Sequence, residues 1–324
     1  MACKHLRMHL SRRDELKLCA DILSEILTHL YDLQKEQKEK VTNTLQHDLD
    51  SLCKNILGIL IKTITIILEG SNSVLPQLVA CLLGLLQLLD ETHYKRYWDE
   101  LSPNKDPRDL KEFLAKSLMV FEELLSQDWL VFPTDWLIMK LACNDVLRKS
   151  LEEFAKPLVY RFLGPKSFDS QLWWTYFSIA VTFLTQPSLQ LEKYREPKRR
   201  KILHSHGDMR VLMGFQILSM WSQLGEQKLH FIPSMVGPFL EVTLVPEPAL
   251  RKATLTVFYD MMQCEQVFRK LILNRNSCIL ICLHSTQAAR GSFRLVESEL
   301  IDKLDLLISG NKGDDEYREL FSTM

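Results

Sequence analysis

Apolar residues recur at intervals of three and four along this chain, and this spacing is the feature that most limits the fold. The first such series is Leu16, Cys19, Leu23, Ile26, Leu30 and Leu33. Side chains spaced in this way lie on one face of an α-helix. Glycine (11) and proline (12) are also too scarce among 324 residues for the many turns of an all-β fold. We therefore expect an all-α protein.

The predicted helices follow one another with short breaks between them. We expect them near residues 11–33, 41–68, 75–89, 107–126, 133–162, 168–184, 188–204 and 208–224. Residues that end helices fall between most of these segments, such as Gly164-Pro165, Gln186-Pro187 and Gly207. No alternation typical of a strand extends beyond a few residues.

Residues 231–262 are typical of a helical repeat. An apolar helix is followed by the turn Pro246-Glu247-Pro248, and a second helix carries Arg251 near its start. Each such pair leaves an apolar face that a neighbouring pair must cover. A similar spacing of 35–45 residues upstream predicts an elongated HEAT-, armadillo- or TPR-like solenoid, in which residues 1–324 form one array.

Two strongly apolar runs, residues 56–68 and 74–89, raise the question of a membrane span. The first contains Lys62, and the second contains Pro76, Gln77 and Gln87. Neither run reaches the roughly 20 apolar residues that cross a bilayer. We interpret both as buried helices.

Charge and cysteine content favour a cytoplasmic protein. The 40 basic and 41 acidic residues give no general attraction for nucleic acid, and the six tryptophans are scattered at helical positions expected in a core. The N-terminal 17 residues show no apolar signal segment. The cysteines lack the spacing of a disulfide framework, so we expect free thiols. They are Cys3, Cys19, Cys53, Cys81, Cys143, Cys264, Cys278 and Cys282.

Motifs for catalysis or cofactor binding are absent from the sequence. Residues 310–313 (GNKG) resemble a helix end more than a phosphate loop. Cys278, Cys282 and His284 lack a fourth metal ligand. His204 and His206 precede Asp208, which we expect to cap the next helix. We predict no catalytic residue, no metal and no cofactor.

One cluster of basic side chains is a candidate binding patch. Its members are Lys193, Arg195, Lys198, Arg199, Arg200 and Lys201. Such a cluster can bind anionic lipid headgroups or an acidic protein, and it is also similar to a nuclear-import run. Glu192 and Glu196 interleave with it, so a solvated helix surface is the alternative interpretation.

Several blocks of sequence together resemble the central region of dedicator-of-cytokinesis (DOCK) proteins. They are LDETHY at 89–94, QLW at 171–173, YFSIAV at 176–181, SLQLE at 188–192, HGDMR at 206–210, FIPSMVGP at 231–238, FYDMM at 258–262, ELIDKLD at 299–305 and GDDEYRELF at 313–321. The best match covers residues 168–321, and its closing blocks are most similar to the Rac-directed subgroups. Between Gln266 and Gly291 the chain carries an atypical insert, residues 267–290.

The resemblance implies a part of a guanine-nucleotide exchange factor for Rac-type small GTPases. Members of the family place a helical-repeat region between a lipid-binding C2-like region and a C-terminal exchange domain. This chain resembles only the helical region, so the resemblance implies a non-catalytic scaffold that positions those two modules. Its expected partners are proteins: the other modules, adaptor proteins and, indirectly, Rac-type GTPases. A stand-alone module that binds proteins or acidic lipids, with peripheral contact at the plasma membrane, is the alternative.

Overall fold

The computed structural model describes residues 13–36, 43–68, 74–102, 107–126, 136–232 and 234–272, together with Asp302 and Leu306. Every regular element within these ranges is helical, which confirms the predicted all-α class. The chain divides into two compact units, residues 1–179 and 180–324, and the boundary falls inside helix α9 (Ser170–Leu184). Most of the predicted insert, residues 273–290, lies outside the described residues. That the whole chain forms one array stays a prediction.

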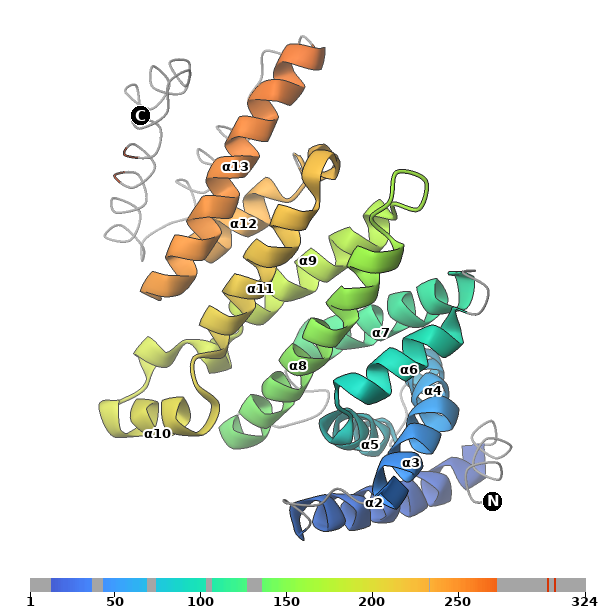
Figure 1. Cartoon of the computed structure of the whole chain (residues 1–324). Coiled ribbons are helices and arrows are strands. Elements are labelled where there is room, and N and C mark those ends of the chain that lie inside the picture. The colour runs from blue at the N-terminus through green and yellow to red at the C-terminus, as the bar shows by residue number, and fades with distance from the viewer. Residues whose placement is uncertain are drawn as a thin grey trace. The chain divides into compact units, whose positions relative to one another are not determined.

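The first unit consists of helices that pack against neighbours close in the sequence (Figure 1). In chain order they are α2 (Arg13–Glu36), α3 (Asn43–Leu52), the π-helical turn η1 (Cys53–Leu57), α4 (Gly58–Leu68), α5 (Leu75–Leu88), α6 (Glu91–Leu101), α7 (Arg108–Ser126), α8 (Leu137–Arg161) and the first part of α9. Helix α2 packs against α5, α4 against α5 and α7, and α5 against α8. Packing between such near neighbours is typical of a helical-repeat protein.

A cluster of aromatic rings forms the centre of this unit. Phe154 of α8 is fully buried, and its ring stacks on Phe121 of α7 at 5.4 Å between centroids. It also meets the edges of Tyr94, Trp98 and Phe113, with centroid distances of 5.3–5.9 Å. Such edge-to-face contacts add to the stabilisation that burial itself provides. Three helices, α6, α7 and α8, are held together by these rings.

The apolar helix formed by α3, η1 and α4 is a core element of the first unit. Within the described part of the chain, residues Thr44–Leu68 meet the length and composition of a membrane span, and so would α5 and α6 together, although these two are bent by 109°. Leu60, Ile61 and Ile64 are nevertheless buried, and α4 packs on α5 and α7. Burial of this kind is what a core helix requires, and it agrees with the interpretation made from the sequence.

Helix α6 was not predicted from the sequence, and its start shows why it forms. The Asp90 carboxylate accepts hydrogen bonds from the backbone N–H groups of Thr92 (2.9 Å) and His93 (3.1 Å). The Asp90 N–H in turn donates to His93 Nδ1, at 3.2 Å. This is a capping box in which histidine occupies the position usually held by glutamate or glutamine.

Replacing Asp90 by alanine should lower the free energy of unfolding by about 1 kcal/mol, because two N–H groups lose their acceptor. Burial opposes ionisation of this carboxyl, but its hydrogen bonds to Thr92 and His93 outweigh burial and lower the pKa of Asp90. The contribution is therefore present above an unfolded-state pKa of about 3.9 and is lost as the pH falls below it. Urea unfolding near neutral pH and in acid measures both effects. Asp99→Ala, an exposed change in the same helix, should have little effect and serves as the control.

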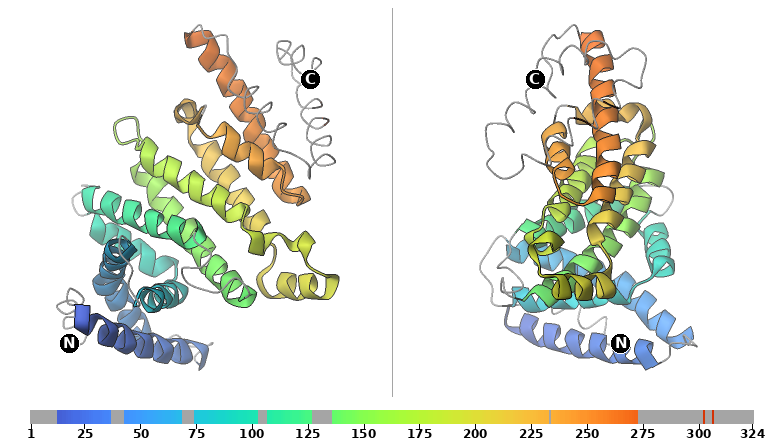
Figure 2. Two further views of the ribbon diagram at one scale, coloured as in Figure 1. Left: turned by 180° about the vertical axis from the view of Figure 1, so that it is seen from behind. Right: turned by 90° about the vertical axis from the view of Figure 1, so that its left-hand side faces the viewer.

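The second unit begins with the last part of α9 and ends with a pair of packed helices (Figure 2). Its elements are the 3₁₀ turns η3 (Pro187–Leu189) and η4 (Leu191–Lys193), α10 (Glu196–His206), α11 (Met209–Gln223), the 3₁₀ helix η5 (Gly225–Phe231), α12 (Val236–Thr243) and α13 (Pro248–Ile272). Helices α11 and α12 both pack against α13. A Cβ atom on Gly214 would lie 2.5 Å from the Leu250 side chain, so glycine permits the close approach of α11 and α13.

The predicted helix 188–204 is wrong in its first half. Residues 187–193 form two 3₁₀ turns, and α10 begins only at Glu196. Pro197 occupies the first turn of α10, where its missing N–H costs nothing. Deeper inside a helix the proline ring would clash with the carbonyl group four residues upstream, so the helix does not extend further in that direction.

Tryptophans occupy both core and surface positions. Trp173 and Trp221 are buried, as predicted, and Trp173 Nε1 donates to the Phe162 carbonyl oxygen at 2.9 Å. Trp136 and Trp174 are exposed instead, which corrects the prediction that the tryptophans belong to the core. Trp129 lies outside the described residues.

Candidate functional site

Helix α10 carries most of the predicted basic patch and lies at the edge of its unit. Figure 1 shows it beyond the N-terminal end of α11. Ile202 is the one buried residue of α10, so nearly the whole circumference of the helix is open. Gly207 ends the helix with a φ of 68°, a conformation that favours glycine, and Asp208 caps α11 as predicted.

The structure brings all six predicted basic residues into one short segment. Lys193 ends η4, Arg195 precedes α10, and Lys198, Arg199, Arg200 and Lys201 follow one another in its first half. Arg199 and Arg200 both pair with Glu196, at 2.9 and 3.0 Å. Exposed pairs of this kind contribute little to stability and leave the arginines accessible.

Glu192, the other acidic residue of the cluster, is held by Arg210 at the start of α11. The Arg210 guanidinium donates to both Glu192 oxygens, Nη1 to Oε2 at 2.8 Å and Nη2 to Oε1 at 3.0 Å. It also donates to both Asp208 oxygens, at 3.0 and 2.8 Å. Burial disfavours this cation, but its hydrogen bonds to Asp208 and Glu192 prevail, so the pKa of Arg210 lies above its ordinary value. The fork thus ties turn η4 to α11.

The sequence alone could not show that the charge of Glu192 is already matched. Residues 192–210 contain seven lysines and arginines against three carboxylates, and the ion pairs of Arg199, Arg200 and Arg210 involve all three carboxylates. Within the described part of the chain, Lys193, Arg195, Lys198 and Lys201 have no carboxylate within ion-pair distance. Lys198 Nζ lies 4.7 Å above the Tyr194 ring, a cation–π contact. The result is a local surplus of four positive charges.

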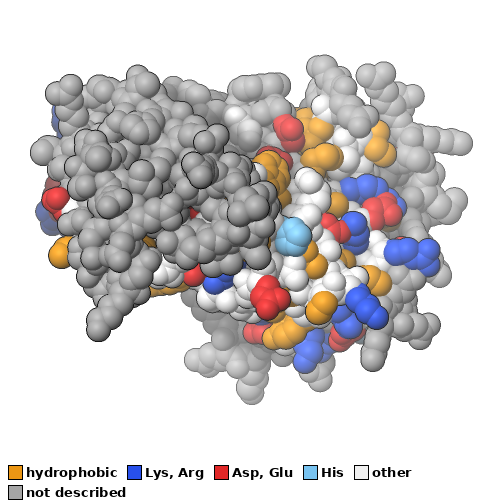
Figure 3. Space-filling model, turned by 90° about the horizontal axis from the view of Figure 1, so that it is seen from above, with side chains coloured by type: hydrophobic (Ala, Val, Ile, Leu, Met, Phe, Trp, Pro, Cys, Tyr) orange, Lys and Arg blue, Asp and Glu red, His pale blue; other side chains and the backbone are white. Residues whose placement is uncertain are grey.

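Another face of the molecule carries charges of both signs. Figure 3 shows basic, acidic and apolar side chains interspersed on the described part of the face seen from above. Interspersed charges of both signs are usual for a solvated protein surface.

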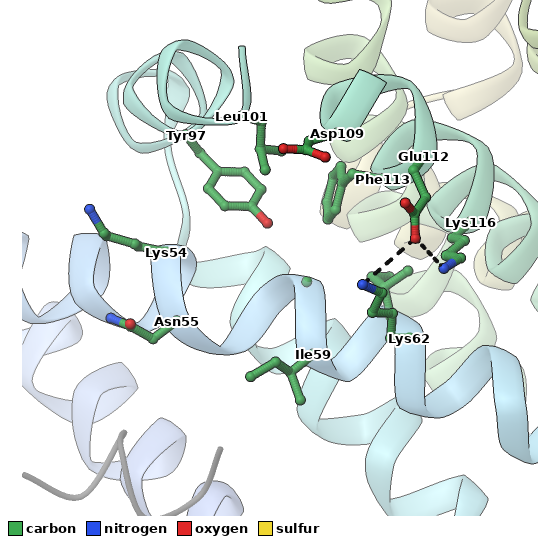
Figure 4. Close-up of a pocket in the computed structure, with 12 residues that line it drawn as sticks. Lys54, Asn55, Ile59, Lys62, Tyr97, Leu101, Asp109, Glu112, Phe113 and Lys116 are labelled. Atoms are coloured by element: carbon green, nitrogen blue, oxygen red, sulfur yellow. Dashed lines mark hydrogen bonds and ion pairs between the residues drawn. The ribbon is translucent and has the colours of Figure 1, made fainter. Parts of the chain in front are cut away.

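A groove in the first unit, of about 370 Å³, lies between α4 and the helices α6 and α7 (Figure 4). Tyr97 and Phe113 contribute aromatic side chains to its lining. Four of its five charged lining residues are paired: Lys54 pairs with Glu100 at 2.5 Å, and Glu112 accepts a hydrogen bond from Lys116 and pairs with Lys62 at 3.6 Å. The Lys54–Glu100 and Lys62–Glu112 pairs link helices on opposite sides, so this groove is a junction between helices.

In the part of the chain that the structure describes, the side chains considered for metal binding or catalysis do not form a site. Among the described residues, no group of three or more His, Cys, Asp or Glu side chains can hold a metal ion. Asp208 is engaged by Arg210, so His204 and His206 have no carboxylate there to act with. Burial raises the pKa of the Cys81 thiol to about 11 and that of Cys143 to about 12, which disfavours a nucleophilic thiolate. Cys278, Cys282, His284 and residues 310–313 lie outside the described residues.

Helices that pack on their near neighbours in the chain, around apolar cores, define a helical-repeat protein. The chain belongs to the dedicator of cytokinesis family: residues 1–324 match the family model described as the "Dedicator of cytokinesis (DOCK) TPR region". The resemblance noted in the sequence is thereby confirmed.

Relatives in two mammals match nearly the whole chain. It is 36% identical to Dedicator of cytokinesis protein 3 of Homo sapiens over 335 residues, 39% to that of Mus musculus over 327, and 38% to Dedicator of cytokinesis protein 4 of Homo sapiens over 331. Each alignment covers 99% of this chain and 15% of the relative. The chain therefore spans about one seventh of the length of these relatives.

Proposed function

We propose that the chain is a non-catalytic scaffold segment of a DOCK exchange factor for Rac-type GTPases. Its role is to hold a membrane-binding module and an exchange module at a defined separation in the cytoplasm. The observation that carries the proposal is the match of all 324 residues to the TPR region of the family. The packed helices described here support it, because repeat arrays transmit position along the chain and present surfaces to protein partners.

Two measurements on the same chain test the two parts of this proposal. The purified chain, added to a Rac-type GTPase loaded with a fluorescent nucleotide, should leave nucleotide release at its basal rate. In a second experiment the chain replaces the corresponding region of Dedicator of cytokinesis protein 3, and a Gly/Ser linker of equal length replaces it in a control. We expect the first replacement to retain exchange on membranes and the linker to lose it, since a flexible linker does not fix the distance between its ends.

The outcomes separate cleanly. Accelerated release by the chain alone would contradict its non-catalytic assignment. Equal exchange by the two replacements would contradict the positional role, because a flexible segment would then suffice. When the replacement chain carries Phe154→Ala, which weakens the core of the first unit, the rate of exchange on membranes should lie between the rates with the intact chain and with the linker.

A further inference from the structure

The basic segment around α10 has a composition that the scaffold role does not require. Its surplus of positive charge remains after the internal ion pairs of Arg199, Arg200 and Arg210 are formed. Lys193, Arg195 and Lys201 are exposed and make no ion pair with the described residues. A concentrated surplus of this kind attracts anions over a distance of about one Debye length, roughly 8–10 Å at physiological salt.

Basic and apolar side chains share the outward side of α10. Arg200, Leu203 and His204 stand three and four positions apart, so they lie on one face of the helix. All three are exposed, and Leu203 has 38% of its surface accessible. Lys201, however, stands two positions before Leu203, on the opposite side of α10, so α10 offers a charged surface and not an amphipathic face.

The segment is also firmly attached to the rest of its unit. The Arg210 fork fixes Glu192, directly before Lys193, to the start of α11. Ile202 anchors α10 itself, and the Tyr194 hydroxyl donates to the Ser188 carbonyl oxygen at 3.4 Å. The charges are therefore presented on a fixed support, which reduces the ordering cost of binding.

We propose that α10 and the preceding turn η4 bind an anionic lipid surface. Phosphate and carboxylate headgroups are the ligands, and the unpaired lysines and Arg195 supply the attraction. This proposal goes beyond the scaffold role and does not depend on it.

The distribution of the charges favours a membrane over an acidic peptide. Three of the four unpaired cations are lysines, which act as point charges and do not form the planar forks that arginine offers to a fixed carboxylate. They extend from Lys193 to Lys201, over a turn and a helix, and a sheet of mobile headgroups can adapt to such an array.

Sedimentation of the 324-residue chain with vesicles tests the proposal. We expect binding to phosphatidylcholine vesicles with about 30% phosphatidylserine, little binding to phosphatidylcholine alone, and release at high salt. The variant Lys193→Glu, Arg195→Glu and Lys201→Glu breaks no ion pair among the described residues. Because each basic group near an anionic surface strengthens binding roughly fivefold, this variant should bind at least about a hundredfold more weakly. Leu203→Ser, which keeps the charge and lies on the other side of α10 from Lys201, should leave binding nearly unchanged.

A matched control carries Lys95→Glu, Lys166→Glu and Lys252→Glu, three exposed lysines outside the segment with the same total change in charge. It should retain most of the binding, and the urea midpoints of all variants should agree. Equal loss in the control would overturn the assignment to α10. Absence of binding to the anionic vesicles, or tight binding of a polyglutamate peptide in its place, would overturn the lipid assignment. Neither result would bear on the scaffold role, which is tested separately by the nucleotide-exchange measurements.

Discussion

Replacing Phe154 by alanine should lower the free energy of unfolding by about 4 kcal/mol, a large effect for one substitution. The ring is fully buried at the centre of a cluster to which three helices contribute. Its removal takes apolar surface out of the core, leaves a cavity among close-packed rings and loses four aromatic contacts. Chemical unfolding, followed by circular dichroism and by tryptophan fluorescence, measures the change.

Tyr160→Ala supplies the matched control on the same helix. Tyr160 has 81% of its surface exposed, so the change should stay within about 0.5 kcal/mol. Phe154→Leu keeps much of the volume and should cost clearly less than the alanine change, which keeps the prediction measurable if Phe154→Ala does not fold. A loss below about 1 kcal/mol for Phe154→Ala would show that the cluster is not the structural centre of the first unit.

Replacing Arg210 by methionine should lower the free energy of unfolding by about 3 kcal/mol. Only 2% of the Arg210 side chain is exposed, and it carries the positive charge that compensates Glu192 and Asp208. Methionine keeps much of the unbranched apolar stem but leaves two carboxylates together without a cation. Removal of one partner from a buried ionic group is costly for this reason, even where the intact group adds little.

Arg200→Met is the appropriate comparison. Arg200, like Arg210, pairs with a glutamate (Glu196), but its side chain is largely exposed. It should cost about 0.5 kcal/mol or less. Combining Arg210→Met with Glu192→Gln should recover part of the loss, since one stranded charge disappears. If Arg210→Met and Arg200→Met had equal effects, the fork would not be what holds η4 to α11.

The helices with regular apolar spacing could be predicted from the sequence, because that spacing records which face of each helix is buried. Helix α6 escaped prediction because residues 91–101 are mostly polar and its capping box uses His93. The first half of the helix predicted over 188–204 forms 3₁₀ turns instead. Pro197 two positions into α10 decides the actual start.

The residues of the candidate site could be predicted from the sequence, but the net charge that remains after ion pairing could not. The six basic side chains are adjacent in the sequence, so any fold would bring them together. The partner of Glu192, by contrast, is 18 residues away, across α10 and the turn at Gly207. Counting charges along the chain therefore assigned Glu192 to the patch, whereas the fold pairs it with the buried Arg210. Only tertiary structure could make that distinction.

The π-helical turn η1 has a consequence for how one apolar helix serves two sets of neighbours. A π-turn holds one residue more than an α-turn, and each residue of an α-helix advances the side chains by about 100°. The side chains of α4 therefore stand about 100° from where an unbroken α-helix would place them. The extra residue thus changes the direction of the side chains partway along one continuous helix. Before it, α3 packs against α2 and α6, and after it, α4 packs against α5 and α7.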